Sequence, residues 1–370
     1  MPCKGDAASV SWVTSDAELR EVVATWQSIV GIDTEFQRTD TFFPIPGLYQ
    51  VLSGEQVYLL DPLTISDWTP LLEVLEDPRV TKIMHACSED LELMRHHFGA
   101  VPRGVFDTQL ANAFLSADYS MSYANLVANL VGEQLDKHET RSNWLQRPLS
   151  DEQLRYAWED VHHLPELHRI LSARLAERGR EGWFADAMAD RGRYRPIDPE
   201  EYYRGVKKAW RLDGVELGML RRLCAWRERK AMAEDVPRNR VVWDEHLFEF
   251  AQMSQLAEET VQEMLPRNVS RRYASELVEQ HSQAVAAGDS LDLLARPLTQ
   301  SQNQLSKTLR EAARAKADTL ELAHELLARK RDVEACIRHY IVNGELSPDY
   351  GGWRGTVVGA AFQAALEERN

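Results

Sequence analysis

The chain has 370 residues, of which 44% are hydrophobic and 27% charged, a composition typical of globular proteins. This length exceeds what one ordinary hydrophobic core occupies, so we expect two or three domains. The net charge of −15 argues against a simple basic nucleic-acid binder, and most of the excess acid lies in residues 1–195.

Membrane and secretion signals are absent from the sequence pattern. No apolar run approaches the length that crosses a bilayer, and the opening MPCKGDAASVSW lacks the apolar core of a secretory signal. The cysteines are scattered singly, without the paired spacing of a metal finger: Cys3, Cys87, Cys224 and Cys336. We therefore expect a cytoplasmic protein that does not associate with membranes.

In chain order, the first half alternates strand-like and helix-like segments. The strand-like segments are bounded by Gly, Pro and Asp and cover 9–14, 29–36, 47–53, 56–61, 80–86 and the start of 104–116. Helices are predicted at 17–27, 67–77, 88–99 and the later part of 104–116, and long helices follow from about Ser150. This order predicts an α/β domain with a central sheet.

The second half is predicted to be entirely helical from Asp213 onward. A stretch rich in Pro, Gly and charge separates it from the first half, and a second break lies near 286–300. We expect an α/β domain at 1–195, a linker at 196–211, and two helical domains at 212–290 and 291–370.

The stretch GIDTEFQR places two acids at the end of a buried-looking strand. Asp33 and Glu35 are two residues apart, so in a strand they point to the same side. Two such charges are costly unless they are protonated or neutralised by a cation. Taken alone, the pair is most simply an exposed strand end, so the question is whether other carboxylates join it.

Further acids occur at element boundaries. Asp90 falls in the first turn of a predicted helix just after a strand, where the helix dipole favours a carboxylate. Tyr156 and Asp160 are four residues apart and share one helix face. Each alone is more simply a cap or surface residue. Asp107, at a strand-to-helix junction, is predicted to be a structural helix N-cap.

Jointly, Asp33, Glu35, Asp90 and Asp160, with Tyr156 four residues before the last acid, resemble the DEDD exonucleases of the tyrosine subgroup. The segments DTEF, HACSEDLE, FDTQLANAFL, DKHETRSNWLQRPLS and LRYAWEDV resemble the ribonuclease D family. The segment LRRLCAWRERKAMAEDVPRNRVVWDEHLFEFA resembles the HRDC domain, and GWRG resembles the end of bacterial members. The resemblance covers essentially the whole chain.

Two positions depart from the family pattern. Trp158 stands between Tyr156 and Asp160 where a small residue is usual, but it is predicted to point away from their shared face. Asn143 precedes Trp144 where the family has Asp. Neither departure touches the catalytic set. The resemblance implies a ribonuclease H-like α/β exonuclease domain, with a mixed central sheet flanked by helices, followed by two all-α HRDC-type domains.

The resemblance also implies the cofactor and the roles of the site residues. Two divalent cations, Mg²⁺ or Mn²⁺, support phosphodiester hydrolysis, and carboxylates suit them because both ions prefer oxygen ligands. Asp33 and Glu35 would share one ion with Asp160, and Asp90 would help to hold the other. Tyr156 would orient or deprotonate the attacking water, and its ordinary pKa of about 10 favours orientation.

Several other residues are candidates for substrate contact. Phe36 is predicted to stack on the terminal nucleotide, with core packing as the equal alternative, and Thr34 to touch that nucleotide. His85 is a candidate contact, with a metal-ligand role and a hydrogen-bonded structural role as its alternatives. The basic stretch predicts a phosphate-binding face, with an exposed helix face as the alternative, at Arg227, Arg229 and Lys230.

The implied function is a metal-dependent 3′–5′ exoribonuclease that releases nucleoside 5′-monophosphates. Its implied substrates are tRNA precursors and other structured RNAs with 3′ tails. The motifs do not separate RNA from DNA, so a 3′–5′ DNA exonuclease stays open. A non-catalytic RNA-binding protein is less favoured because all four acids and Tyr156 are present. No obligate protein partner is indicated.

Overall fold

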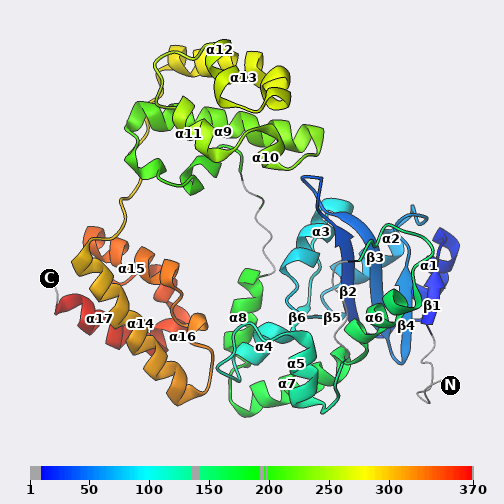
Figure 1. The fold of residues 1–370 in the computed structure, drawn as a ribbon. Helices are drawn as coiled ribbons and strands as arrows, with labels where there is room; N and C mark the ends of the chain where they lie inside the picture. Colours follow the sequence, from blue (N-terminus) through cyan, green and yellow to red (C-terminus); the bar gives the residue numbers. More distant parts are fainter. Residues whose placement is uncertain (1–9, 136–141, 192–195, 197, 369–370) are drawn as a thin grey trace. The chain divides into compact units, whose positions relative to one another are not determined.

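The structure, a computed structural model, describes residues 10–135, 142–191, 196 and 198–368 (Figure 1). The chain forms two compact units, each built from separate stretches of sequence. The first comprises Met1–Gln37, Pro46–Tyr194 and Leu298–Asn370, and the second Arg38–Ile45 and Arg195–Pro297. The opening nine residues and part of the motif at 136–150 lie outside the described residues. The boundaries expected at 195, 211 and 290 stay predictions.

A six-stranded mixed sheet lies at the centre of the first unit. Its strands run in the order β1 (Val10–Val13), β4 (Gln56–Leu60), β3 (Ile45–Ser53), β2 (Ile29–Gln37), β5 (Thr81–Met84) and β6 (Val105–Asp107). β1 is parallel to β4, β3 is antiparallel to β4, and β2, β5 and β6 are parallel. Every expected strand is present, which confirms the predicted mixed sheet.

Helices cover both faces of this sheet because alternate strand residues are apolar on both sides. Leu48 and Leu52 of β3 pack with one set of helices, and Tyr49 and Val51 with the other. The first set comprises α4 (Thr108–Ala113), α5 (Tyr123–Leu130), α6 (Asp151–His162), α7 (Leu164–Glu177) and α8 (Glu181–Arg191). The second set comprises α1 (Asp16–Val23), α2 (Thr69–Glu76) and α3 (Ser88–Phe98).

The C-terminal helices belong to the same unit as the sheet. They are α14 (Gln300–Leu320), α15 (Lys330–Asn343), α16 (Gly352–Arg354) and α17 (Ala360–Glu367), and they enclose a core of their own. Ala323 and Leu326 pack into the core on the α6–α8 side of the sheet. The Trp353 and Trp183 rings stack with centroids 5.1 Å apart. This region is therefore packed on the α/β domain.

The second unit is a helical module. Its helices are α9 (Gly214–Glu234), α10 (Arg238–Val241), α11 (Asp244–Phe250), α12 (Glu258–Met264) and α13 (Arg267–Ala287). The loop between β2 and β3 contributes Phe42, which is 7% exposed, to the core of this module. The Asp235 carboxylate accepts hydrogen bonds from the backbone N–H groups of Phe42 and Phe43, both at 3.0 Å.

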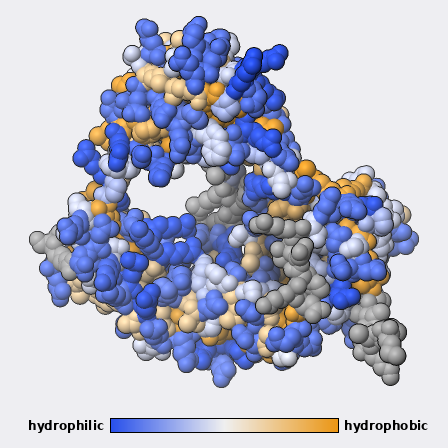
Figure 2. Space-filling model, in the orientation of Figure 1, coloured by the Kyte–Doolittle hydropathy of each residue, from blue (hydrophilic) through white to orange (hydrophobic). Residues whose placement is uncertain are grey.

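Most apolar side chains lie inside the two units, and the face shown in Figure 2 is largely hydrophilic. Among the described residues, no helix combines the length and the apolar character that spanning a membrane requires.

Candidate active site

The site is built around β2, the strand that carries Asp33 and Glu35. The two acids alternate with buried residues of the strand, so their side chains share the sheet face that α6 and α7 cover. Gly31 precedes them on the same face, where a Cβ would lie 3.2 Å from Leu164 and 3.4 Å from the Val161 carbonyl. Glycine therefore allows the α6–α7 junction to approach the strand closely.

Helix α6 supplies Tyr156 and Asp160. It begins with a capping box in which Ser150 and Gln153 each bond the other's backbone N–H. The Tyr156 hydroxyl and the Asp160 carboxylate are hydrogen-bonded across one turn of the helix. Trp158 points elsewhere, since its ring stacks on His162 with centroids 4.0 Å apart. The expectation that Trp158 leaves the catalytic face free is confirmed.

The carboxylates of Asp33, Glu35 and Asp160 converge, with ligand oxygens within 4.8 Å of one another. Asp90, the third residue of α3, is 8% exposed and accepts a hydrogen bond from the Thr34 hydroxyl. One Asp160 oxygen is buried with no protein partner. A cluster of oxygen ligands with an unpartnered buried carboxylate oxygen fits a divalent cation.

Burial and mutual repulsion raise the pKa values of these acids. For Glu35, desolvation followed by the charges of Asp160 and Asp90 raises the pKa to about 9. Burial raises the pKa of Asp160 to about 7 and that of Asp90 to about 6, although hydrogen bonds from Tyr156 and Thr34 oppose the shifts. Asp33 is shifted in the same direction. Without a cation, the cluster retains protons near neutral pH.

Burial also raises the pKa of Tyr156, and the charges of Asp160, Glu35 and Asp33 add to the shift. The hydroxyl therefore stays protonated at neutral pH. It can donate a hydrogen bond and orient a water molecule, but it is a poor base on its own.

The other candidates beside the catalytic set differ in position. Thr34 is 6% exposed and its hydroxyl holds Asp90, a role that the sequence did not suggest. Phe36 is partly buried against the core beneath α1–α3. His85 is engaged at both ring nitrogens, Nδ1 with the Thr108 hydroxyl at 2.8 Å and Nε2 with the Met121 carbonyl at 3.1 Å. This geometry favours the structural alternative for His85.

The three basic residues of α9 do not form one exposed face. Arg227 is 1% exposed and is enclosed by Glu228, Asp244 and the Val242 carbonyl. A phosphate cannot reach this buried guanidinium, so the structure contradicts the expectation for Arg227. Arg229 is exposed and paired with Glu200, and Lys230 is half-buried and paired with Glu276 at 2.7 Å.

The sequence did not reveal an ion pair between Asp107 and Arg191, which lies at the turn before α3. Asp107 is the N-cap of α4, as predicted, but its carboxylate also meets Arg191 at 2.5 Å. Asp107 occupied a recognised junction in the sequence, whereas nothing in the pattern marked Arg191 as its partner 84 residues later.

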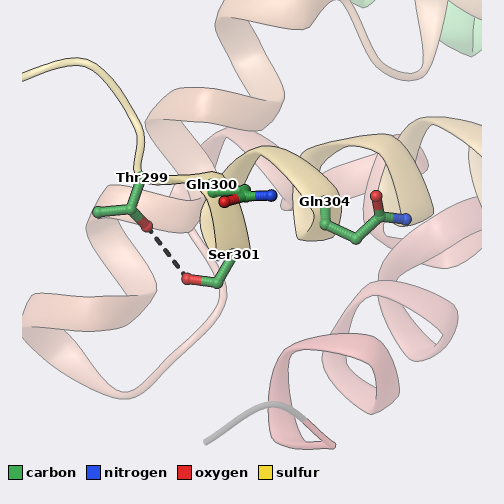
Figure 3. Close-up of a pocket in the computed structure, with 4 residues that line it drawn as sticks. All are labelled: Thr299, Gln300, Ser301 and Gln304. Carbon is green, nitrogen blue, oxygen red and sulfur yellow. Dashed lines mark hydrogen bonds between the residues drawn. The ribbon is translucent and has the colours of Figure 1, made fainter.

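A separate shallow depression of about 600 Å³ lies at the first turn of α14 (Figure 3). It is lined by Thr299, Gln300, Ser301 and Gln304, and the Thr299 and Ser301 hydroxyls are 3.1 Å apart. These neutral side chains include none of the carboxylate cluster, so the depression contributes no chemistry to the site.

Comparison with known families agrees with this geometry. The model of the 3′–5′ exonuclease family matches residues 10–176, and that of the HRDC domain matches residues 216–279. The fold and the carboxylate cluster together define a 3′–5′ exonuclease with an appended HRDC domain. A second HRDC-type domain at 291–370 stays a prediction.

Full-length relatives define the family more closely. Ribonuclease D of Pseudomonas paraeruginosa is 41% identical, covering 98% of both chains, and that of Escherichia coli K12 is 33% identical, covering 96% of this chain and 98% of the relative. The crystal structure of Escherichia coli RNase D, described as "an exoribonuclease involved in structured RNA processing", matches with a TM-score of 0.89. It is 30% identical and covers 97% of this chain and 99% of that one. The chain belongs to the ribonuclease D family of 3′–5′ exoribonucleases.

Proposed function

We propose that this chain shortens structured RNAs, including tRNA precursors with 3′ tails, one nucleotide at a time from the 3′ end. Each step would release a nucleoside 5′-monophosphate. The convergence of Asp33, Glu35 and Asp160 within 4.8 Å is the observation that carries this proposal. Their placement beside Tyr156 and Asp90 provides a water-orienting group and a fourth acid.

The proposed catalytic set is Asp33, Glu35, Asp90, Tyr156 and Asp160. Two divalent cations, Mg²⁺ or Mn²⁺, would neutralise the phosphate and activate the attacking water when they are bound to the four acids. Thr34 fixes Asp90 through its hydroxyl. The protonated Tyr156 hydroxyl, hydrogen-bonded with Asp160, would orient the water for attack on the terminal phosphodiester.

Substrate contacts outside the acids are proposed for residues that the structure leaves reachable. Phe36, on the catalytic strand, is partly buried and could stack on a terminal base. In the HRDC domain, Arg229 is 60% exposed at its side chain and Lys230 is 24% exposed. Both would have to exchange a carboxylate partner for a phosphate. Arg227 and His85 are not included, because their polar groups are already enclosed.

The test compares RNA and DNA oligonucleotides of one sequence, each with a 5′ label, in Mg²⁺, in Mn²⁺ and with EDTA. We expect a ladder that shortens from the 3′ end, monophosphate products, preference for RNA, and no cleavage with EDTA. Equal cleavage of DNA would favour the DNA exonuclease, and binding without cleavage would favour the non-catalytic alternative.

Variants identify the residues responsible. Asp33→Asn should abolish cleavage, and Tyr156→Phe should slow it by about 10²–10⁴-fold, the usual contribution of a positioned proton-transfer group. Asp67→Asn is the matched control because Asp67 is an exposed carboxylate paired with Arg20. Substantial activity in folded Asp33→Asn protein would refute the assignment of the acids.

A further inference from the structure

Asp107 receives an unusual number of hydrogen bonds at the point where two helices begin. Its carboxylate is fully buried. Oδ1 accepts from the N–H groups of Gln109 at 2.9 Å and Leu110 at 3.1 Å, which cap α4. The same carboxylate accepts from Ala86 at 3.2 Å and Cys87 at 3.1 Å, which lead into α3. One side chain therefore joins the starts of α3 and α4.

The turn that Asp107 holds is conformationally demanding. Ala86 has a φ of +54°, a left-handed conformation that residues with a side chain rarely adopt. Cys87, the N-cap of α3, makes no side-chain capping bond of its own. Asp107 supplies acceptors to this turn from a neighbouring strand. Because Asp90 is the third residue of α3, the geometry of the turn fixes where α3 carries its carboxylate.

Arg191 completes the arrangement from the last position of α8. Its Nη1 lies 2.5 Å from Asp107 Oδ2, and its side chain is 16% exposed. Burial raises the pKa of Asp107, but the Arg191 guanidinium and the backbone N–H groups outweigh it and hold the pKa below its usual value. Asp107 therefore stays charged.

We propose that Asp107 and Arg191 are positioning residues that set the place of Asp90 in the carboxylate cluster. This inference rests on the proposed function in that it takes Asp90 as a metal ligand. The pair acts through the Ala86–Cys87 turn and has no contact with substrate. Residues that orient metal ligands typically influence metal affinity by about 10–100-fold.

Two substitutions of the same kind in the same region provide the test. Arg191→Met removes the cation that pairs with Asp107. Arg180→Met is the matched control, since Arg180 is 5% exposed, immediately precedes α8, and donates to the carbonyls of Phe114 and Leu320. Both variants lose a largely buried guanidinium, but only Arg191→Met loses a contact with Asp107, the residue that holds the start of α3.

Mn²⁺ binding is measured by isothermal calorimetry on the full chain without RNA, and melting temperature is recorded separately. We expect Arg191→Met to raise the Mn²⁺ dissociation constant about 10-fold or more, and Arg191→Lys, which keeps the charge, to recover part of the loss. Arg180→Met should lower the melting temperature but change the dissociation constant by less than about twofold, because distant sites act independently.

An unchanged dissociation constant in folded Arg191→Met protein, or equal losses in both Met variants, would overturn the proposal. If Arg191→Met does not fold, the double variant Asp107→Asn/Arg191→Met, which removes both charges together, is measured against the same criterion. Asp90→Asn tests whether Asp90 is a metal ligand, independently of the positioning role of Asp107 and Arg191. Mn²⁺ binding unaffected by Asp90→Asn contradicts the proposed function, whereas weakened binding there with normal binding in Arg191→Met contradicts only the positioning role.

Discussion

At Glu35, burial and the charges of Asp160 and Asp90 raise the pKa to about 9. Burial likewise raises the pKa of Asp160 to about 7 and that of Asp90 to about 6, against the opposing hydrogen bonds from Tyr156 and Thr34. An unfolded chain releases these protons near pH 4. The folded, metal-free protein therefore holds protons that the unfolded chain has lost, and the difference persists from about pH 4 to about pH 9.

This difference predicts how the stability of the metal-free protein depends on pH. Since the folded state binds more protons, the free energy of unfolding falls as pH rises through this window. We expect the melting temperature in EDTA to decrease between pH 6 and pH 8.5, and Glu35→Gln to reduce the slope. A saturating divalent cation should reverse the trend, because ligands must lose protons to bind it. A melting temperature in EDTA that rises over this range would contradict the pKa shifts of the cluster.

The proposed catalytic residues were predictable because each lies where local pattern fixes its direction. Asp33 and Glu35 follow from strand alternation, and Tyr156 and Asp160 from the helical repeat. Arg227 was misjudged because α9 is buried on several sides, from Leu220 to Glu228, so its periodicity does not reveal an exposed face. The Asp107–Arg191 pair depends on tertiary packing that no local pattern contains.

Among the elements, β3 and the segment before α6 come into close contact at Gly47. A Cβ at this position would lie 2.6 Å from Trp144 Cβ and 3.0 Å from the Trp144 carbonyl. Trp144 in turn packs beside Tyr156, with ring centroids 6.0 Å apart. Glycine at 47 thus allows the segment before α6 to pack on the sheet and support Tyr156, the proposed catalytic tyrosine.

Gly47→Ala should therefore destabilise the protein by about 1–3 kcal/mol, as overpacking of a filled interior does. Gly182→Ala is the matched control, because Gly182 lies in α8 with nothing within 4 Å of the added Cβ. There we expect a gain of about 0.5–1 kcal/mol from the helix preference of alanine. Urea unfolding of both variants measures the change in the free energy of unfolding. A Gly47→Ala protein more stable than the original would show that Trp144 can move to accommodate the added methyl group at little cost.

The sequence predicted every strand of the α/β domain and most of its helices, since their apolar patterns are regular, but it did not predict α5. It did not predict that the C-terminal helices share a unit with the sheet. That association depends on single side chains, such as Ala323 and Leu326 after α14 and Trp353 of α16. Such contacts join residues more than 100 positions apart, so no periodic pattern of apolar residues in the sequence reveals them.

For the whole molecule, this packing predicts that the α/β domain depends on the last helices. Arg180 donates to the Leu320 carbonyl, and the Ala323 N–H donates to the Ala113 carbonyl at 2.8 Å. A chain that ends at Pro297 should expose the surface under Ala323 and Leu326, melt at lower temperature, and be cleaved faster by proteases. Adding residues 298–370 as a separate fragment should restore part of the stability. A truncated chain as stable as the full one would show that this interface contributes little.

The discontinuous first unit has a consequence for synthesis on the ribosome. Translation advances at about 5–20 residues per second, so roughly 10–35 s pass between the end of α8 and the emergence of the last helices. During that interval, the sheet and its carboxylates exist without the segment that covers one side of their core. We expect nuclease activity to mature only after Leu298–Asn370 has been made, so that the growing chain spares the messenger and ribosomal RNA beside it until then.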